Sequence, residues 1–150
     1  MSLYLLLHVL SVVVWVGGMF FAYMALRPVA ASVLEPPQRL TLWVGVFGKF
    51  FPWVWASVAL ILLTGLILLM KIGGAAAPHY ALTMLALGVA MMLIFAHVFF
   101  APYKKLKRAV SEQNWKAGGA ALGQIRMLIG INLSIGLLTI VVVFLGRGLA

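Results

Sequence analysis

The chain has 150 residues, of which 65% are hydrophobic and only 9% are charged. Soluble domains carry charge on about a quarter of their residues, so this composition excludes an ordinary soluble fold and indicates a membrane protein. The net charge of +9 comes from eleven Lys and Arg against two acids, and there is no cysteine. These counts exclude a disulfide scaffold, a zinc–thiolate site and a cysteine nucleophile, and we expect no nucleic-acid partner.

Four apolar runs are long enough to cross a bilayer. They cover residues 3–26, 50–70, 80–103 and 127–145. A helix needs about 20 residues to cross a hydrocarbon core of about 30 Å, and each run reaches that length. A spanning segment must satisfy its backbone internally, so helices are expected. The sequence therefore predicts an all-α, antiparallel four-helix membrane bundle that forms a single domain over residues 1–150.

Prolines mark the expected joints between these runs. Pro28 is expected to end the first span, and the segment 35–38 to open the second helix ahead of the membrane. Pro52 stands where that helix enters the hydrocarbon, and Pro102 is expected to end or bend the third helix. The polar stretch 104–126 is predicted to contain an amphipathic helical lead into the fourth span.

Basic residues divide unequally between the two sides of the membrane. The first side holds nine of them: Arg27, Arg39, Lys49, Lys104, Lys105, Lys107, Arg108, Lys116 and Arg126. The second side holds Lys71 and Arg147. The positive-inside rule then predicts that both termini and the 71–79 loop face away from the cytoplasm. We expect the basic face to contact anionic lipid, in a multi-pass protein of a bacterial inner membrane.

Three histidines lie in or at the edge of the apolar runs, where ionisable side chains are costly and commonly functional. His8 lies five residues into the first run, about 7 Å deep at about 1.5 Å per residue. His79 stands at the outer end of the third run, which has the opposite direction. The two are therefore predicted to lie at similar depth near the non-cytoplasmic face. His97 follows eighteen residues later on the same helix.

Two histidines at one depth on different helices can supply both axial ligands of a haem. His8 and His79 therefore predict a haem b near the outer face. Two axial histidines leave no open position on the iron, which favours electron transfer or oxidation at the membrane over oxygen binding. A membrane redox partner or quinone would then exchange electrons with the haem.

Four further residues are candidates for the surroundings of this haem. Their side chains can donate hydrogen bonds, pack on a macrocycle or meet its propionates. They are Ser11 and Asn132 as donors, Trp15 as a packing surface and Lys71 as a propionate partner.

Methionine offers a second interpretation of the same spans. The chain has eight methionines, and thioether and imidazole ligands together suit copper(I). A copper(I) path through His8, Met19 and His97 is therefore an alternative, and an accessory subunit that only scaffolds a larger complex is another. A homo-oligomer is also expected, because so small a bundle exposes much helix surface and Gly119 and Gly123 have the spacing of a close-packing motif.

Several segments resemble the CopD-like and HemJ-like membrane proteins. The resemblance is carried by residues 8–21 (HVLSVVVWVGGMFF), Arg27-Pro28, Phe51-Pro52-Trp53, Thr64-Gly65 and residues 97–103 (HVFFAPY). For CopD-like proteins it implies copper resistance or uptake. For HemJ-like proteins it implies a haem-b-dependent oxidase that converts protoporphyrinogen to protoporphyrin, with histidines at the positions of His8 and His79. A haem-dependent membrane oxidoreductase is thus a further alternative.

Overall fold

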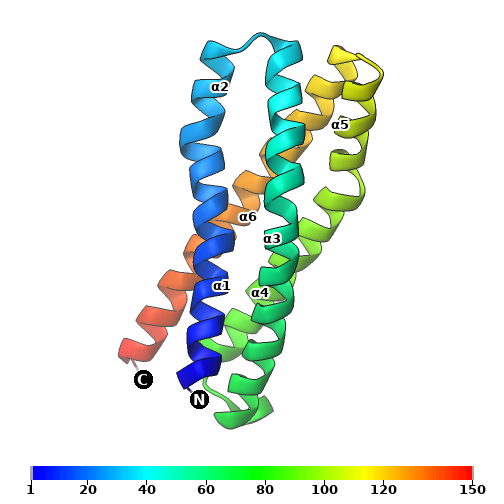
Figure 1. Ribbon diagram of the computed structural model, residues 1–150. Helices are drawn as coiled ribbons and strands as arrows, with labels where there is room; N and C mark the ends of the chain where they lie inside the picture. The colour runs from blue at the N-terminus through cyan, green and yellow to red at the C-terminus, as the bar shows by residue number, and fades with distance from the viewer. Residues whose placement is uncertain (1, 150) are drawn as a thin grey trace.

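The computed structural model describes residues 2–149, and that part of the chain is almost entirely helical (Figure 1). The elements are α1 (Ser2–Phe21), a π-helical turn η1 (Ala22–Leu26), α2 (Arg27–Val33), α3 (Pro36–Lys71), a 3₁₀ turn η2 (Gly74–Ala76), α4 (His79–Phe100), α5 (Pro102–Ser111) and α6 (Trp115–Leu149). These join into four helical segments that are long and apolar enough to cross a membrane. The predicted all-α, four-span membrane protein is confirmed.

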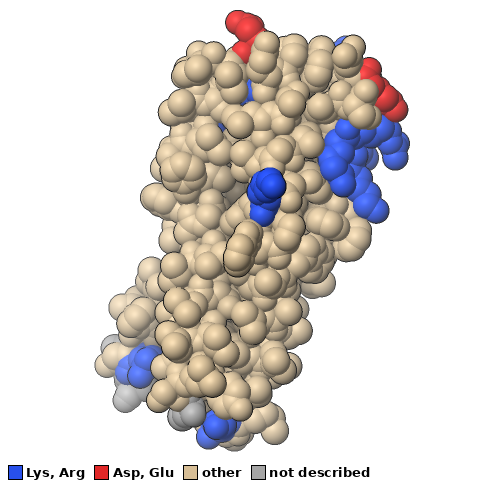
Figure 2. Space-filling view, viewed as in Figure 1, with Lys and Arg blue, Asp and Glu red and all other residues tan. Residues whose placement is uncertain are grey.

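The four segments run alternately up and down between two distinct ends of the bundle. Both termini lie at one end, here named the terminal end, and the α2–α3 connection and α5 lie at the other (Figure 1). α1 packs along α3, α4 and α5 pack against α6, and α6 crosses obliquely behind the first helix. Figure 2 shows most of the visible Lys and Arg near the second end, named the basic end. Which end faces the cytoplasm stays a prediction.

The first helix continues through Pro28, so the joint expected there is wrong. The Arg27 N–H donates to the carbonyl of Ala22, five residues back, which makes a π turn. Pro28 has no N–H, so the Tyr23 carbonyl lacks its usual backbone donor. The Nε of Arg27 donates to that carbonyl instead, at 3.1 Å. The wider turn absorbs the proline ring, and the helix runs on to Val33.

Pro36 and Pro102 stand at helix boundaries, as the sequence predicts. Pro36 opens α3, at a position where the missing N–H has no partner to lose. Pro52 lies inside α3, and Pro102 opens α5 directly after α4 ends. α5 is strongly amphipathic, with Tyr103 and Leu106 on its buried face. The polar stretch thus contains an amphipathic helix, but α5 ends at Ser111, and the helix that leads into the fourth span is α6, which begins at Trp115.

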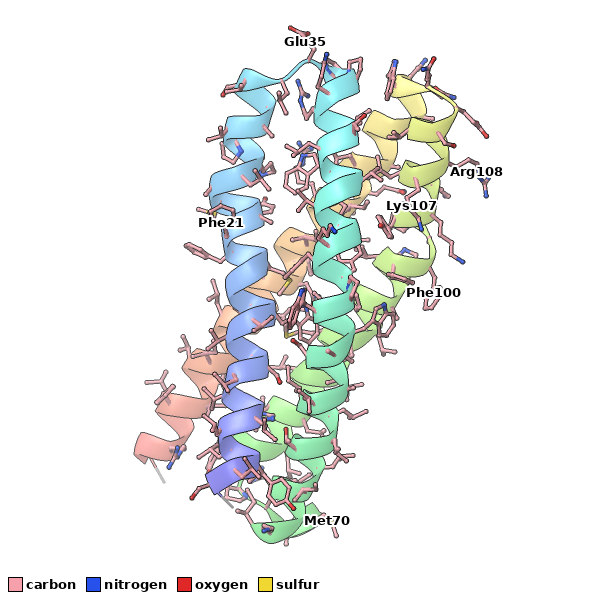
Figure 3. The ribbon with its side chains drawn as sticks, viewed as in Figure 1. Phe21, Glu35, Met70, Phe100, Lys107 and Arg108 are labelled. Carbon is pink, nitrogen blue, oxygen red and sulfur yellow. The ribbon has the colours of Figure 1, made fainter. Side chains whose placement is uncertain are left out.

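Aromatic side chains of α3 form the centre of the core. Phe47 stacks on Phe51 with ring centroids 4.9 Å apart. Phe51 also meets Phe95 of α4 at 5.3 Å and Tyr103 of α5 at 4.9 Å, both edge-on. Such pairs add to the apolar burial and tie α3 to α4 and α5. Large apolar side chains also cover the outside, where Phe21 points away from the bundle (Figure 3), as lipid exposure requires.

Candidate metal-binding site

His8 is held against α3 by a hydrogen bond in the terminal half of the bundle. Its Nδ1 lies 3.0 Å from Oγ1 of Thr64, a side chain that is 2% exposed. The Thr64 hydroxyl donates its only proton to the Leu60 carbonyl, at 2.5 Å. Its oxygen must therefore accept from His8, which places the proton of the neutral ring on Nδ1. Nε2 is then left unprotonated, with a lone pair free to bind a metal.

Gly65 gives the His8 ring the space it occupies beside α3. A methyl group at Gly65 would lie 3.3 Å from Cε1 of His8, closer than an ordinary carbon contact. α3 thus both hydrogen-bonds the half-buried ring and packs against it. In the sequence, Thr64 and Gly65 contribute to the family resemblance, but the sequence alone assigns neither of them a role at the site. The available signal was a hydroxyl side chain inside an apolar run, followed directly by a glycine.

The other two histidines lie on the exposed surface of α4. His79 is the first residue of that helix, and His97 lies near its other end. The start of α4 packs against the end of α6, where a methyl at Gly146 would lie 2.4 Å from Cβ of Tyr80. Within residues 2–149, no group of three or more His, Cys, Asp or Glu side chains is placed to hold a metal. The pairing of His8 with His79 around a haem stays a prediction.

Ser11 and Lys71 make local contacts. The buried Ser11 hydroxyl donates to the Leu7 carbonyl, one turn back, at 2.8 Å. The ammonium of Lys71, the last residue of α3, lies 5.1 Å from the centroid of the Tyr4 ring. This cation–π contact fixes the end of α3 beside the start of α1. The roles of Ser11 as a donor to a cofactor and of Lys71 as a propionate partner stay predictions.

Trp15, Met19 and Asn132 come together in the middle of the bundle. Each is 3% exposed, and all three line an internal cavity of about 20 Å³ whose other walls are apolar. The Asn132 Nδ2 donates to the Met91 carbonyl at 3.2 Å. The Asn132 Oδ1 is buried and has no hydrogen-bond partner among residues 2–149. The structure thus gathers three predicted site residues, two of which, Trp15 and Met19, lie about 10 Å and about 16 Å along the first helix from His8 at about 1.5 Å per residue.

Comparison with known proteins gives one match. The family described as copper resistance protein D matches residues 44–145, which is more than half of the chain. The matched range contains Thr64, Gly65 and Asn132 and begins after the first helix, which carries His8. No match to the chain was found among curated proteins or among solved structures.

Proposed function

We propose that this chain, which belongs to the copper resistance protein D family, binds copper(I) as cargo and passes it into the membrane with His8 as the entry ligand. The family and the four spanning helices make the chain a multi-pass membrane protein linked to copper resistance. The finer proposal rests on the His8–Thr64 hydrogen bond, because that bond presents Nε2 of a half-buried imidazole as a free ligand near the terminal end.

The side chains within the helices favour copper(I) over harder cations. The chain has no cysteine, and its two acids, Glu35 and Glu112, are exposed in the connections between helices. Magnesium, calcium and manganese prefer carboxylate and free carbonyl oxygens, whereas the helices within residues 2–149 hold no carboxylate and their backbone carbonyls accept helical hydrogen bonds. Imidazole and thioether groups, by contrast, suit copper(I).

One face of the first helix joins His8 to the central cavity. Met19 follows His8 by eleven residues, which is about three helical turns at about 3.6 residues per turn, so both side chains lie on the same face. Ser11 and Trp15 lie between them and are buried. Met19 offers a soft sulfur at the cavity, and the unpartnered Asn132 Oδ1 adds an oxygen donor. His97 lies on a different helix, α4, and is exposed, so we leave it out of the path.

Copper(I) affinity of the purified protein tests the proposal directly. A competing chromogenic chelator under reducing, oxygen-free conditions measures that affinity in detergent. We expect His8→Ala to weaken binding at least about tenfold, the range found when metal sites lose a supporting group. His97→Ala, which removes an exposed histidine, is the matched control and should stay within about twofold. A His8→Ala protein that binds copper(I) like the wild type would refute the entry role.

The absorption spectrum of the same preparation tests the haem prediction. A Soret band that disappears in both His8→Ala and His79→Ala would support a bis-histidine haem b and contradict the copper proposal. A colourless protein that takes up copper(I) supports the copper proposal. A colourless protein that binds no copper(I) would favour the scaffold alternative.

A further inference from the structure

A second, larger cavity lies at the basic end, between the first helix, α3 and α6. Its volume is about 400 Å³, within the range of roughly 300–1,000 Å³ that is usual for ligand sites. Tyr23, Trp43 and Trp115 contribute aromatic walls. Four cationic side chains line it: Arg27, Arg39, Lys116 and Arg126.

Backbone carbonyls hold the two half-buried arginines of this cavity. The Arg27 Nε donates to the carbonyl freed by the π turn, and its guanidinium lies 4.4 Å from the Tyr23 ring centroid. The Arg39 Nη2 donates to the carbonyls of Leu34 at 3.1 Å and Ala31 at 3.4 Å, which caps the end of α2. A guanidinium has five N–H donors, so each arginine keeps others for a ligand. One of these, the Arg39 Nε–H, is buried without a partner.

No carboxylate lines the cavity to balance these charges. The acids nearest the basic end are both exposed, and Figure 3 shows Glu35 pointing out from the end of the bundle. Cations that are partly withdrawn from water require an opposite charge nearby. Guanidinium groups match the geometry of phosphate and carboxylate oxygens through paired N–H bonds. The cavity is therefore suited to an anionic ligand.

The depth of the cavity places that ligand at the membrane surface. Arg27 directly follows the first apolar run, and Arg126 directly precedes the fourth. Both therefore lie at the boundary between hydrocarbon and head groups. Arg39 and Lys116 each precede an apolar run by eleven residues, about 16 Å of helix, so they lie further out on the aqueous side. Gly119 and Gly123 line the same cavity, and a methyl group at either one would meet no atom within 4 Å. That open strip along α6 leads toward Arg126 and the hydrocarbon, and it leaves room for the first part of an acyl chain.

We propose that this cavity binds the phosphate group of an anionic phospholipid. Arg27 and Arg39 donate hydrogen bonds to the phosphate, and the acyl chain begins along the open strip of α6 at Gly119 and Gly123. Basic pockets between spanning helices are known to take lipid head groups. The site is distinct from the basic cluster on α5, whose side chains do not line the cavity. Figure 3 shows Arg108 of that cluster pointing away from the bundle. The proposal is independent of the copper function.

Tryptophan fluorescence of the delipidated protein tests this site, because Trp43 and Trp115 stand in its wall. The probes are dioctanoyl phosphatidylglycerol, dioctanoyl phosphatidylcholine and inorganic phosphate. We expect phosphatidylglycerol to bind at least about tenfold more tightly than the other two, as one or two charged hydrogen bonds allow. Arg39→Gln should weaken that binding about tenfold or more. Arg108→Gln, the matched charge control on α5, should change it less than about twofold.

If Arg39→Gln fails to fold because it removes a helix cap, two other variants still test the proposal: Gly123→Leu and Lys116→Gln. Gly123→Leu fills the cavity without changing charge, and Lys116→Gln alters only the rim; both should weaken phosphatidylglycerol binding in a protein of unchanged helical content. Equal losses in Arg108→Gln would overturn the proposal, because the attraction would then belong to the whole basic surface. Equally tight binding of phosphatidylcholine or of inorganic phosphate would also overturn it.

Discussion

Thr64→Val removes one hydroxyl from the copper site and keeps the shape of the side chain. Thr64 is 2% exposed, and valine has nearly the same volume, so no cavity forms. The Nδ1–H of His8 loses its acceptor. The Leu60 carbonyl loses a second donor but keeps its bond within α3. The change therefore isolates the orientation of His8 from the packing between α1 and α3.

The expected magnitudes follow from this one lost contact. Hydrogen bonds between membrane helices average about 0.6 kcal/mol, and an unsatisfied buried donor costs about 1–3 kcal/mol. The free energy of unfolding in detergent should therefore fall by about 1–2 kcal/mol. Without its partner the ring can rotate or carry its proton on Nε2, so copper(I) affinity should fall about 10–100-fold.

Chelator competition and unfolding by SDS measure these two quantities in the same preparation. Thr64→Ser is the matched control, because it keeps the hydroxyl and should retain most of the copper(I) affinity. If Thr64→Val binds copper(I) as tightly as the wild type, Thr64 does not orient His8 and the reasoning fails. A loss of affinity as large in Thr64→Ser as in Thr64→Val would also contradict it, since the methyl group would then be responsible.

Three further predictions concern packing, the central cavity and topology. Gly146→Ala should destabilise the protein by about 1–3 kcal/mol in thermal unfolding, because its methyl would lie 2.4 Å from a Cβ of α4. Gly148→Ala, which meets nothing within 4 Å, should leave stability unchanged; equal losses would refute this packing. Asn132→Leu removes a buried oxygen without a partner together with the Nδ2–H bond to the Met91 carbonyl. Because the gain and the loss offset each other, it should unfold no more readily than the wild type while reducing copper(I) passage; a large loss of stability would contradict this. In the cysteine-free chain, Ala75→Cys should react in intact cells with a membrane-impermeant maleimide and Ser111→Cys should not; the reverse pattern would invert the predicted orientation.

The sequence predicts the spans well because their length and composition alone decide them. Each apolar run is long enough to cross a bilayer, and the structure places a helix over each of the four. Pro102 ends a helix as expected because its effect is local. Pro28 does not, because a π turn and the Arg27 side chain together replace the missing bond. This replacement hydrogen bond comes from a side chain four residues away from the carbonyl that accepts it. The hydrophobic periodicity of the sequence does not predict it.

The partner of His8 is harder to predict than its depth. Counting residues from the end of a span gives a depth, whereas a partner depends on which helix lies beside α1. In lipid, apolar side chains face outward as well as inward, so the apolar pattern does not identify the contacting face. The structure shows α1 along α3, which makes Thr64 the neighbour of His8. For the same reason the cavity around Arg27 and Arg39 is visible only once three helices are placed together.

The helices are longer than a bilayer is thick, so a rigid helical part of the protein extends beyond the membrane. α3 has 36 residues and is about 54 Å long, against about 30 Å of hydrocarbon. Its apolar run begins only near residue 50, so the preceding turns stand beyond the hydrocarbon, beside α5. A helical domain inserted at the short connection before α3, with Pro36 and Pro37 replaced by helix-forming residues, would continue this rod without a hinge. It would add the asymmetric mass that a 16.3 kDa chain lacks for alignment in single-particle electron microscopy.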